Sequence, residues 1–371
     1  MSELAQFRTE VRSFLVESLA IGAACPNFGT IMPPAFHEQA RSWQRHMHEH
    51  GFAGLHWPAE YGGRGASVEM SGVWGEECAR AGVAPYMNFQ GVVLAGPAVI
   101  RFGTQEQKHR FLEPTLSGEI LWCQLFSEPN AGSDLVSLAA TATPTDGGWN
   151  VTGQKVWSST AHLAQQAILL ARTDPDERGH RGISFFLLDM DTPGLDVRPL
   201  RQMTGDIEFC EVFMDDVFVP LEHLLGDLNA GWTVATAVLA DERAGAGAAG
   251  VALQLSVDQM AHSPTEPSLD GPARDRVMSL HATGGAVGHL LRRSGGDPTL
   301  GPLSKLARTE LGSRMSGFAL DRQGAAGMLE NEATKDFLYA PGMRIAGGTS
   351  EVQRNLIGER LLGLPREPRP A

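Results

Sequence analysis

The feature of this 371-residue chain that most constrains its fold is a change of hydrophobic pattern, from helical to β and back to helical. Residues 1–120 carry apolar side chains at helical spacing, as at Phe7, Val11 and Phe14. Residues 121–228 hold short β-rich runs separated by Asp-Gly, Pro-Gly and Arg-Gly turn signals. Helical spacing returns in residues 229–371. The pattern predicts an α+β fold with helical N-terminal and C-terminal domains around a middle β domain.

Within this order, individual elements can be located. Helices are expected over residues 36–50, 92–102, 105–116 and 352–362. Strands are expected over residues 149–152, 167–171, 183–188 and 211–213. The Gly-rich stretch 51–65 predicts a loop among the N-terminal helices, and the Pro- and Gly-rich stretch 262–273 predicts a second loop in the C-terminal part.

Composition excludes several classes of function. The formal net charge of −13 and the absence of a clustered basic segment argue against nucleic acid as a partner. The N-terminus lacks the long apolar core of a signal peptide or membrane anchor, so we expect a cytoplasmic protein without a membrane partner. The four cysteines are scattered without a CxxC pair, which favours reduced thiols over a disulfide or zinc framework.

The basic residues are unusually biased towards arginine. Of the 30 lysines and arginines only four are lysines, namely Lys108, Lys155, Lys305 and Lys335. We attribute the bias to a GC-rich bacterial genome and attach no functional meaning to it.

Two local patterns imitate binding motifs. The GAGAAG sequence of residues 245–250 matches GxGxxG but continues a helical run and follows no buried strand, so it predicts close helix packing and no dinucleotide site. His46 and His50 lie four residues apart, with His48 between them, and could share one helical face. No HExxH-type third ligand accompanies them, so we predict a solvated helix surface and no metal site.

The stronger signal is a series of ordered motifs that spans almost the whole chain. QLFSEPNAGSD begins at Gln124, GQKVWSS at Gly153 and IAGGTSEVQRNL at Ile345. WPAEYGG, FGTQEQKHRFL, TGDIEFCEVFMDDVFVP and GERLLGLP occupy the expected places around them. In this order the motifs resemble the acyl-CoA dehydrogenase family. The resemblance implies a helical domain at residues 1–120, a β-barrel domain at 121–228 and a four-helix-bundle domain at 229–371.

The resemblance also implies FAD as cofactor and an acyl-CoA thioester as substrate. A flavin ring needs a flat apolar wall and hydrogen-bond donors, which an indole, hydroxyls and backbone amides can supply. By resemblance the flavin-binding residues are Gln124, Phe126, Ser127, Gly132, Ser133, Trp157, Ser159, Thr349 and Glu351. By resemblance the substrate-binding residues are Ser133, Arg243 and Gly348.

The catalytic base of the family is displaced in this sequence. The family's reaction removes a proton from the carbon α to the thioester while hydride leaves the β carbon for flavin N5, and it needs a carboxylate. Many members place that glutamate where this chain has Gly347. Isovaleryl-CoA dehydrogenase-like members place it instead before an arginine on the first long C-terminal helix, which here reads LADERAG. The resemblance therefore implies Glu242 as base, with Asp241 as the near alternative.

Gly347 keeps a role without a side chain. Its backbone N–H can still polarise the thioester carbonyl, as the resemblance implies for residue 347. The missing side chain leaves space that we expect to admit a bulkier acyl chain.

One departure from the family bears on assembly. Many members carry an Arg-x-x-Phe-Gly segment whose arginine reaches the flavin of a neighbouring subunit, whereas this chain has HSPTEPSLDGPARDR there. The resemblance therefore leaves open a homotetramer or an α2β2 heterotetramer of the kind that acts on bulky substrates such as steroid side-chain thioesters. It implies an electron-transferring flavoprotein as electron acceptor, and a place in β-oxidation of fatty acids or other lipids.

Two further hypotheses remain for function. The chain could be a catalytically silent subunit of a heterotetrameric acyl-CoA dehydrogenase. It could also be a flavin oxidase or monooxygenase on the same fold, which would consume dioxygen where a dehydrogenase delivers electrons to a flavoprotein.

Overall fold

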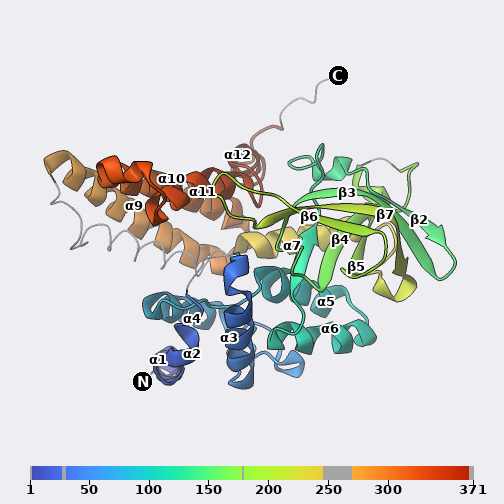
Figure 1. The fold of residues 1–371 in the computed structure, drawn as a ribbon, viewed down its shortest axis with the longest axis horizontal. Helices are drawn as coiled ribbons and strands as arrows, with labels where there is room; N and C mark the ends of the chain where they lie inside the picture. The colour runs from blue at the N-terminus through green and yellow to red at the C-terminus, as the bar shows by residue number, and fades with distance from the viewer. Residues whose placement is uncertain (1, 27–30, 178, 245–269, 367–371) are drawn as a thin grey trace. The chain divides into compact units, whose positions relative to one another are not determined.

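The computed structural model describes residues 2–26, 31–177, 179–244 and 270–366 (Figure 1). The chain forms two compact units that do not follow sequence order. The first comprises Met1–Arg8, Val68–Ala81 and Glu242–Ala371, and the second comprises Thr9–Ser67 and Gly82–Asp241. Helical N-terminal and C-terminal parts enclose a β part in the sequence, so the predicted α+β class is confirmed. The division into three domains, with boundaries at residues 120 and 228, stays a prediction.

The second unit contains a curled seven-stranded sheet, green to yellow in Figure 1. Its main path runs β1-β4-β2-β3-β7-β6, and β5 pairs with β4. Pairing is antiparallel except that β4 runs parallel to β1 and β2. The strands are β1 (Trp122–Leu125), β2 (Thr141–Thr145), β3 (Gly148–Ser159), β4 (Gln166–Arg172), β5 (Ile183–Asp189), β6 (Leu195–Pro199) and β7 (Phe209–Pro220).

The strand sequences explain this sheet. β4 and β5 are apolar runs that are buried along almost their whole length. β4 lies inside the sheet and β5 pairs with it. β2 and β3 are joined at Asp146-Gly147, where Gly147 has a φ of +75° that suits a tight hairpin turn. Side chains from both ends of the sheet, including Trp149, Phe186 and Met214, share one apolar core. The four expected strand segments lie within β3, β4, β5 and β7, which confirms them.

Helices complete the second unit. They include α3 (His37–Glu49), α5 (Gly96–Phe102) and α6 (Gln105–Ser117), as expected. Thr104 and Gln107 form a capping box at the start of α6, and the Gln107 amide also donates to the carbonyl oxygens of Glu222 and Leu224. This side chain therefore ties α6 to the segment that follows β7. The remaining helices are α1 (Glu3–Glu17), α2 (Leu19–Gly22) and α7 (Gly231–Ala244). Of these, α1 begins in the first unit and α7 ends in it.

The first unit is helical. It is built from α4 (Val68–Ala81), α9 (Gly271–Gly296), α10 (Gly301–Gln323), α11 (Glu332–Ile345) and α12 (Ser350–Leu356). α10 packs against both α9 and α11, and the core between α9 and α10 includes Leu280, Leu291 and Phe318 (Figure 1). Most of the loop expected over residues 262–273 lies outside the described residues, and its C-terminal end was predicted wrongly. Asp270 accepts a hydrogen bond from the Ala273 amide and starts α9 at Gly271.

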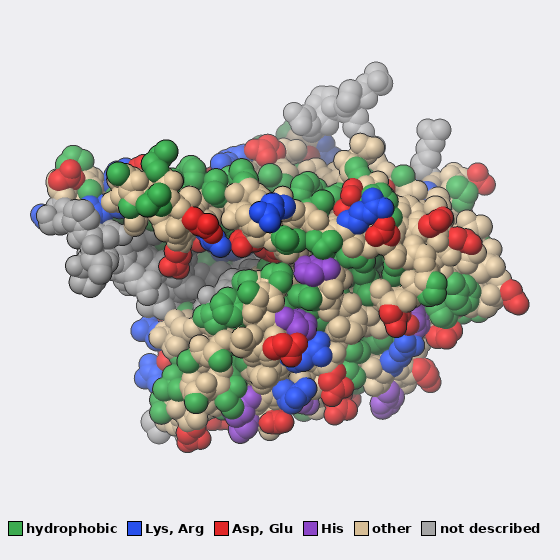
Figure 2. Space-filling view, viewed as in Figure 1, with side chains coloured by type: hydrophobic (Ala, Val, Ile, Leu, Met, Phe, Trp, Pro, Cys, Tyr) green, Lys and Arg blue, Asp and Glu red, His purple; other side chains and the backbone are tan. Residues whose placement is uncertain are grey.

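Surface charges are mixed. On the face drawn in Figure 2, acidic and basic side chains are interspersed over the described residues. Among the helices of the described part of the chain, none is long and apolar enough to span a bilayer.

A buried ion pair joins the two motifs of the β part. Lys155 on β3 is 0% exposed, and its ammonium donates to Glu128 Oε1 at 2.8 Å and to the Phe126 carbonyl at 3.2 Å. Glu128 in turn accepts from the backbone amides of Ala139 and Ala140. Because both charges are buried, removal of either one would leave its partner as an uncompensated buried charge. Burial lowers the pKa of Lys155 to about 8, although Glu128 opposes the shift.

Replacing Lys155 by methionine leaves the Glu128 carboxylate buried without its counter-charge. We expect K155M to lower the free energy of unfolding by roughly 3–5 kcal/mol in urea denaturation. The control is K335M, because Lys335 makes an exposed ion pair with Glu330 at 3.8 Å. That variant should change stability by at most about 1 kcal/mol. Equal effects in the two variants would contradict the structural role of the buried pair.

Candidate functional site

The most unusual aromatic residue of the sheet is Trp157. It lies at an irregularity in the pairing of β3 with β7 and adopts a φ of +62°, a left-handed conformation that costs energy for a bulky residue. Its indole is 62% exposed, with one edge against the Phe209 ring at a centroid distance of 6.0 Å. The strand irregularity thus presents a large flat apolar surface outside the core.

Several predicted flavin residues gather near this tryptophan in the sheet unit. The Val156 amide donates to the Ser127 carbonyl at 2.9 Å, which places the residues after β1 beside β3. Gln124, Ser127 and Ser159 are each partly exposed. Phe126 differs, because its ring is buried and packs edge-on against Phe185. Only the backbone of Phe126 can therefore be offered to a ligand.

The turn after β1 leaves the remaining predicted residues open. Glu128 and Ala131 exchange backbone hydrogen bonds of 3.0 and 3.1 Å, which closes a tight turn. Gly132 and Ser133 follow it and are exposed. A Cβ at Gly132 would have no atom within 4 Å, so a ligand can approach this backbone closely.

In the helical unit, the structure brings Glu242 to Gly347. A Cβ built on Gly347 would lie 3.1 Å from Glu242 Oε1 and 3.7 Å from Glu242 Cδ. The carboxylate therefore adjoins the place where a side chain at position 347 would begin. The space at Gly347 is taken up by this carboxylate, so the expected extra room for an acyl chain is wrong at this point.

Side chains of residues outside the turn at residues 347–348 hold its backbone in place. Gly347 and Gly348 have φ values of +65° and +92°, which glycine adopts without steric cost. Gln353 Nε2 donates to the carbonyls of Gly347 and Gly348 at 3.1 and 3.2 Å, and Lys305 Nζ donates to that of Gly348 at 2.7 Å. No backbone–backbone hydrogen bond from the Gly347 N–H occurs within the described ranges. The hydrogen bonds from Gln353 and Lys305 thus occupy the carbonyl groups of the turn.

Thr349 and Glu351 belong to the start of α12. The Thr349 hydroxyl accepts from the Val352 amide at 3.2 Å and so caps the helix. Glu351 is exposed, and hydrogen bonds from its own backbone amide and from Thr349 lower the pKa of its carboxyl. Both residues lie in the same unit as Glu242, whereas the other predicted flavin residues lie in the sheet unit.

Asp241, the alternative base, has a different partner. Its carboxylate forms an ion pair with Arg101 on α5, within the sheet unit. Glu242 and Asp241 thus have distinct surroundings although they are neighbours in sequence. Arg243 lies on α7, but its side chain falls outside the described residues, as does the GAGAAG sequence.

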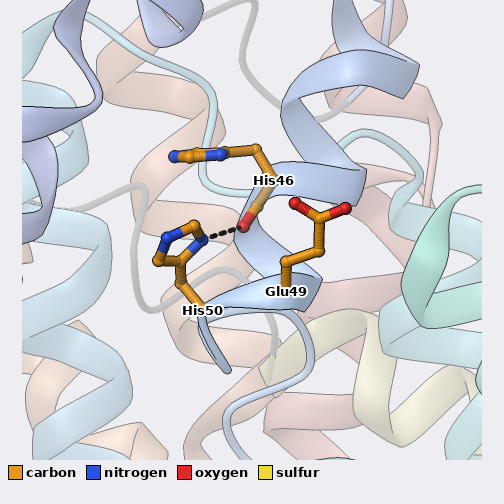
Figure 3. A group of neighbouring side chains, drawn as sticks. All are labelled: His46, Glu49 and His50. Carbon is orange, nitrogen blue, oxygen red and sulfur yellow. Dashed lines mark hydrogen bonds between the residues drawn. The ribbon is translucent and has the colours of Figure 1, made fainter.

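The histidine pattern on α3 has a third member that the sequence did not suggest. Figure 3 shows His46, Glu49 and His50 at the end of this helix, with candidate ligand atoms within 4.8 Å of one another. Ring nitrogens of both histidines are already engaged, because His46 Nε2 bonds to Ser18 Oγ at 2.8 Å and His50 Nδ1 to the His46 carbonyl at 2.8 Å. Burial, and then His50, lower the pKa of His46.

Sequence reasoning missed the two buried lysines. Of the four lysines, Lys155 and Lys305 are buried. Lys155 donates to the carbonyl of Phe126 and Lys305 to that of Gly348, and both acceptors are predicted site residues. In a chain that otherwise uses arginine, retention of lysine was a usable signal. A lysine ammonium is compact enough for an enclosed space where a guanidinium is not. The attribution of the arginine bias to genome composition stays a prediction.

Comparison with known proteins identifies the class of protein. Family models of the acyl-CoA dehydrogenase N-terminal, middle and C-terminal domains match residues 1–119, 123–217 and 275–362. The chain is 37% identical over 393 residues to acyl-CoA dehydrogenase IpdE1 of Mycolicibacterium smegmatis, with 99% of both chains covered. The chain therefore belongs to the acyl-CoA dehydrogenase family, whose members are flavoproteins and oxidoreductases that act on CH–CH groups.

Two further relatives are informative, one for its length and one for its fold. Acyl-CoA dehydrogenase FadE34 of Mycobacterium tuberculosis is 43% identical over 326 residues, which cover 85% of this chain but 45% of that relative. This chain thus spans less than half the length of FadE34. The solved structure of the Tcur3481-Tcur3483 steroid ACAD has a TM-score of 0.85 at 26% identity, with 98% of both chains covered.

Alanine at Gly347 tests the geometry of the turn. We expect G347A to lower the free energy of unfolding by about 1–2 kcal/mol because of the left-handed φ. The matched control is G342A, since Gly342 lies in α11 and a Cβ there would have no atom within 4 Å. That variant should be neutral or stabilising, because alanine favours a helix. Denaturant unfolding of both variants measures the difference, and a harmless G347A would contradict the turn conformation.

Proposed function

We propose that this protein is an FAD-dependent acyl-CoA dehydrogenase in which Glu242 is the catalytic base. The observation that carries the proposal is the 3.1 Å approach of Glu242 Oε1 to the Cβ position of Gly347. Many members of the family carry their base at the position of Gly347. A carboxylate on α7 that lies at the same place can remove the same proton.

The chemistry asked of these residues is proton removal with stabilisation of the developing charge. Glu242 takes the proton from the carbon α to the thioester, and the electron pair of that C–H bond becomes the α,β double bond. The Gly347 N–H is proposed to bind the thioester oxygen, where negative charge develops. Bound FAD supplies the acceptor for the hydride that leaves the β carbon.

The sheet residues fit a flavin in chemical character. Trp157 offers an exposed indole, and Ser127 and Ser159 offer hydroxyls and backbone groups on the adjoining segments. Gln124, the Phe126 backbone, Gly132 and Ser133 complete the proposed set in this unit. Thr349 and Glu351 are proposed to contribute from the helical unit.

For the substrate, we propose a bulky acyl-CoA of the steroid side-chain class. The support is the likeness to the solved structure of the steroid ACAD. Ser133, Arg243 and Gly348 are the proposed substrate contacts. An electron-transferring flavoprotein is the proposed electron acceptor.

The assembly is proposed to be a homotetramer or an α2β2 heterotetramer. The name of the steroid ACAD structure contains two protein designations, Tcur3481 and Tcur3483. FadE34 is more than twice as long as its own segment that aligns with this chain. Both facts are compatible with a second, related chain. Co-expression with candidate partner chains, followed by mass measurement of the complex, would distinguish the two assemblies.

Substitution of the proposed base is the primary test. We expect Glu242→Gln to slow anaerobic bleaching of the flavin by acyl-CoA by a factor of about 10²–10⁴, the range for loss of a general base. Short-chain, long-chain and steroid side-chain thioesters should be compared in stopped-flow absorbance. The purified protein, alone or with its partner, must first be yellow.

The control for this test is Asp241→Asn. Because Asp241 is paired with Arg101, its replacement should leave most of the bleaching rate. Loss of bleaching in Asp241→Asn with retention in Glu242→Gln would instead identify Asp241 as base. Unchanged turnover in both variants would favour a silent subunit, and dioxygen consumption with substrate would favour an oxidase or monooxygenase.

A further inference from the structure

Lys305 on α10 is a buried cation that contacts the backbone of the glycine turn, Gly347–Gly348. Only 4% of the residue is exposed. Its Nζ donates to the Gly348 carbonyl at 2.7 Å and to the Arg344 carbonyl at 3.1 Å. Arg344 lies in the last turn of α11 and Gly348 lies just before α12. One ammonium therefore binds the backbone on both sides of Gly347.

The glycine turn needs such an external anchor. Two successive glycines adopt the left-handed conformation but bring no side chain with which to hold it. Bonds to charged donors are stronger than those between neutral groups, so an ammonium holds the carbonyls more firmly than an amide would. The choice of a buried lysine in an arginine-rich chain fits a small enclosed site.

We propose that Lys305 is a positioning residue that fixes the Gly347–Gly348 turn and whose positive charge acts on the Glu242 carboxylate. The inference rests on the proposed function, because it assigns Lys305 to the same base and the same amide. It adds a residue outside the proposed sets of substrate and cofactor contacts, which acts through Glu242 and the turn.

The charged groups around Lys305 come from four helices. They are Arg308 on α10, Glu242 on α7, Arg344 on α11 and Glu351 on α12. Burial, followed by Arg308, lowers the pKa of Lys305 to about 8, and Glu242 opposes this shift. Attraction between Lys305 and Glu242 is mutual, so the lysine charge favours the ionised carboxylate. The charge is present at neutral pH and is lost as the pH rises through about 8.

Gln353 provides a matched comparison. It is 0% exposed and donates to the same turn, through Nε2 to the carbonyls of Gly347 and Gly348. Unlike Lys305 it carries no charge. Replacing Gln353 therefore loosens the turn without altering the field at Glu242, whereas replacing Lys305 does both.

The experiment compares Lys305→Met with Gln353→Met in the flavin-loaded enzyme. Anaerobic flavin reduction is followed from about pH 5 to 10, with the thioester that reduces the wild-type flavin fastest. A turn displaced by about 1 Å costs on the order of 10²-fold in rate, so both variants should be slower. Only Lys305→Met should also move the acidic limb of the profile to higher pH and abolish an alkaline limb near pH 8.

Several outcomes would overturn the inference. A Lys305→Met enzyme with the wild-type rate and profile removes the positioning role. A slowed enzyme whose profile matches that of Gln353→Met removes the role of the charge. If Lys305→Met does not retain flavin, Lys305→Gln gives the same comparison, because it keeps a donor but no charge.

The control that separates this inference from the proposed function is Glu242→Gln. If that variant retains the wild-type rate, the proposed function fails, and the inference fails with it. If it is slow while Lys305→Met and Lys305→Gln behave as wild type, only the inference fails.

Discussion

Close contact between a carboxylate and a glycine is the constraint on which the proposed active site depends. Glu242 Oε1 lies so near Gly347 that even a single methyl group there would touch it. A side chain at 347 and a glutamate at 242 therefore compete for one place. The left-handed conformation of Gly347 reinforces the choice, because any residue with a Cβ would add backbone strain to the steric conflict.

Two buried lysines stabilise backbone segments, one in each unit. Lys155 binds the Phe126 carbonyl and Glu128 in the sheet unit, and Lys305 binds the Gly348 and Arg344 carbonyls in the helical unit. In both units the carbonyl acceptors lie in or beside segments that carry proposed ligand contacts. The partners differ in kind: Lys155 has a buried carboxylate at 2.8 Å, whereas carbonyls accept the bonds of Lys305. Because carbonyl groups accept the hydrogen bonds of Lys305, these bonds do not neutralise its positive charge, which can act on the Glu242 carboxylate.

The sequence predicted the order of the elements and the family, because hydrophobic period and ordered motifs are local signals. The expected helices at α3 and α6 and the strands β4 and β5 are confirmed to within a few residues. It could not predict that α9 begins at Gly271, since the Asp270 cap lies inside a Pro- and Gly-rich stretch. Nor could it show the Phe126 ring in the core, because motif and core positions look alike in one sequence. The family resemblance implied that Glu242 takes over the role of a base at position 347, but the direct approach of its carboxylate to Gly347 is seen only in the structure.

The most direct measurement is an experimental structure of the protein with FAD and an unreactive acyl-CoA analogue. The account predicts a Glu242 carboxylate oxygen about 3–3.5 Å from the carbon α to the thioester, the distance of a group ready to react. It also predicts the Gly347 N–H within hydrogen-bonding distance of the thioester oxygen. A structure in which another carboxylate, such as Asp241, occupies that position, or in which no carboxylate reaches the α carbon, would contradict it.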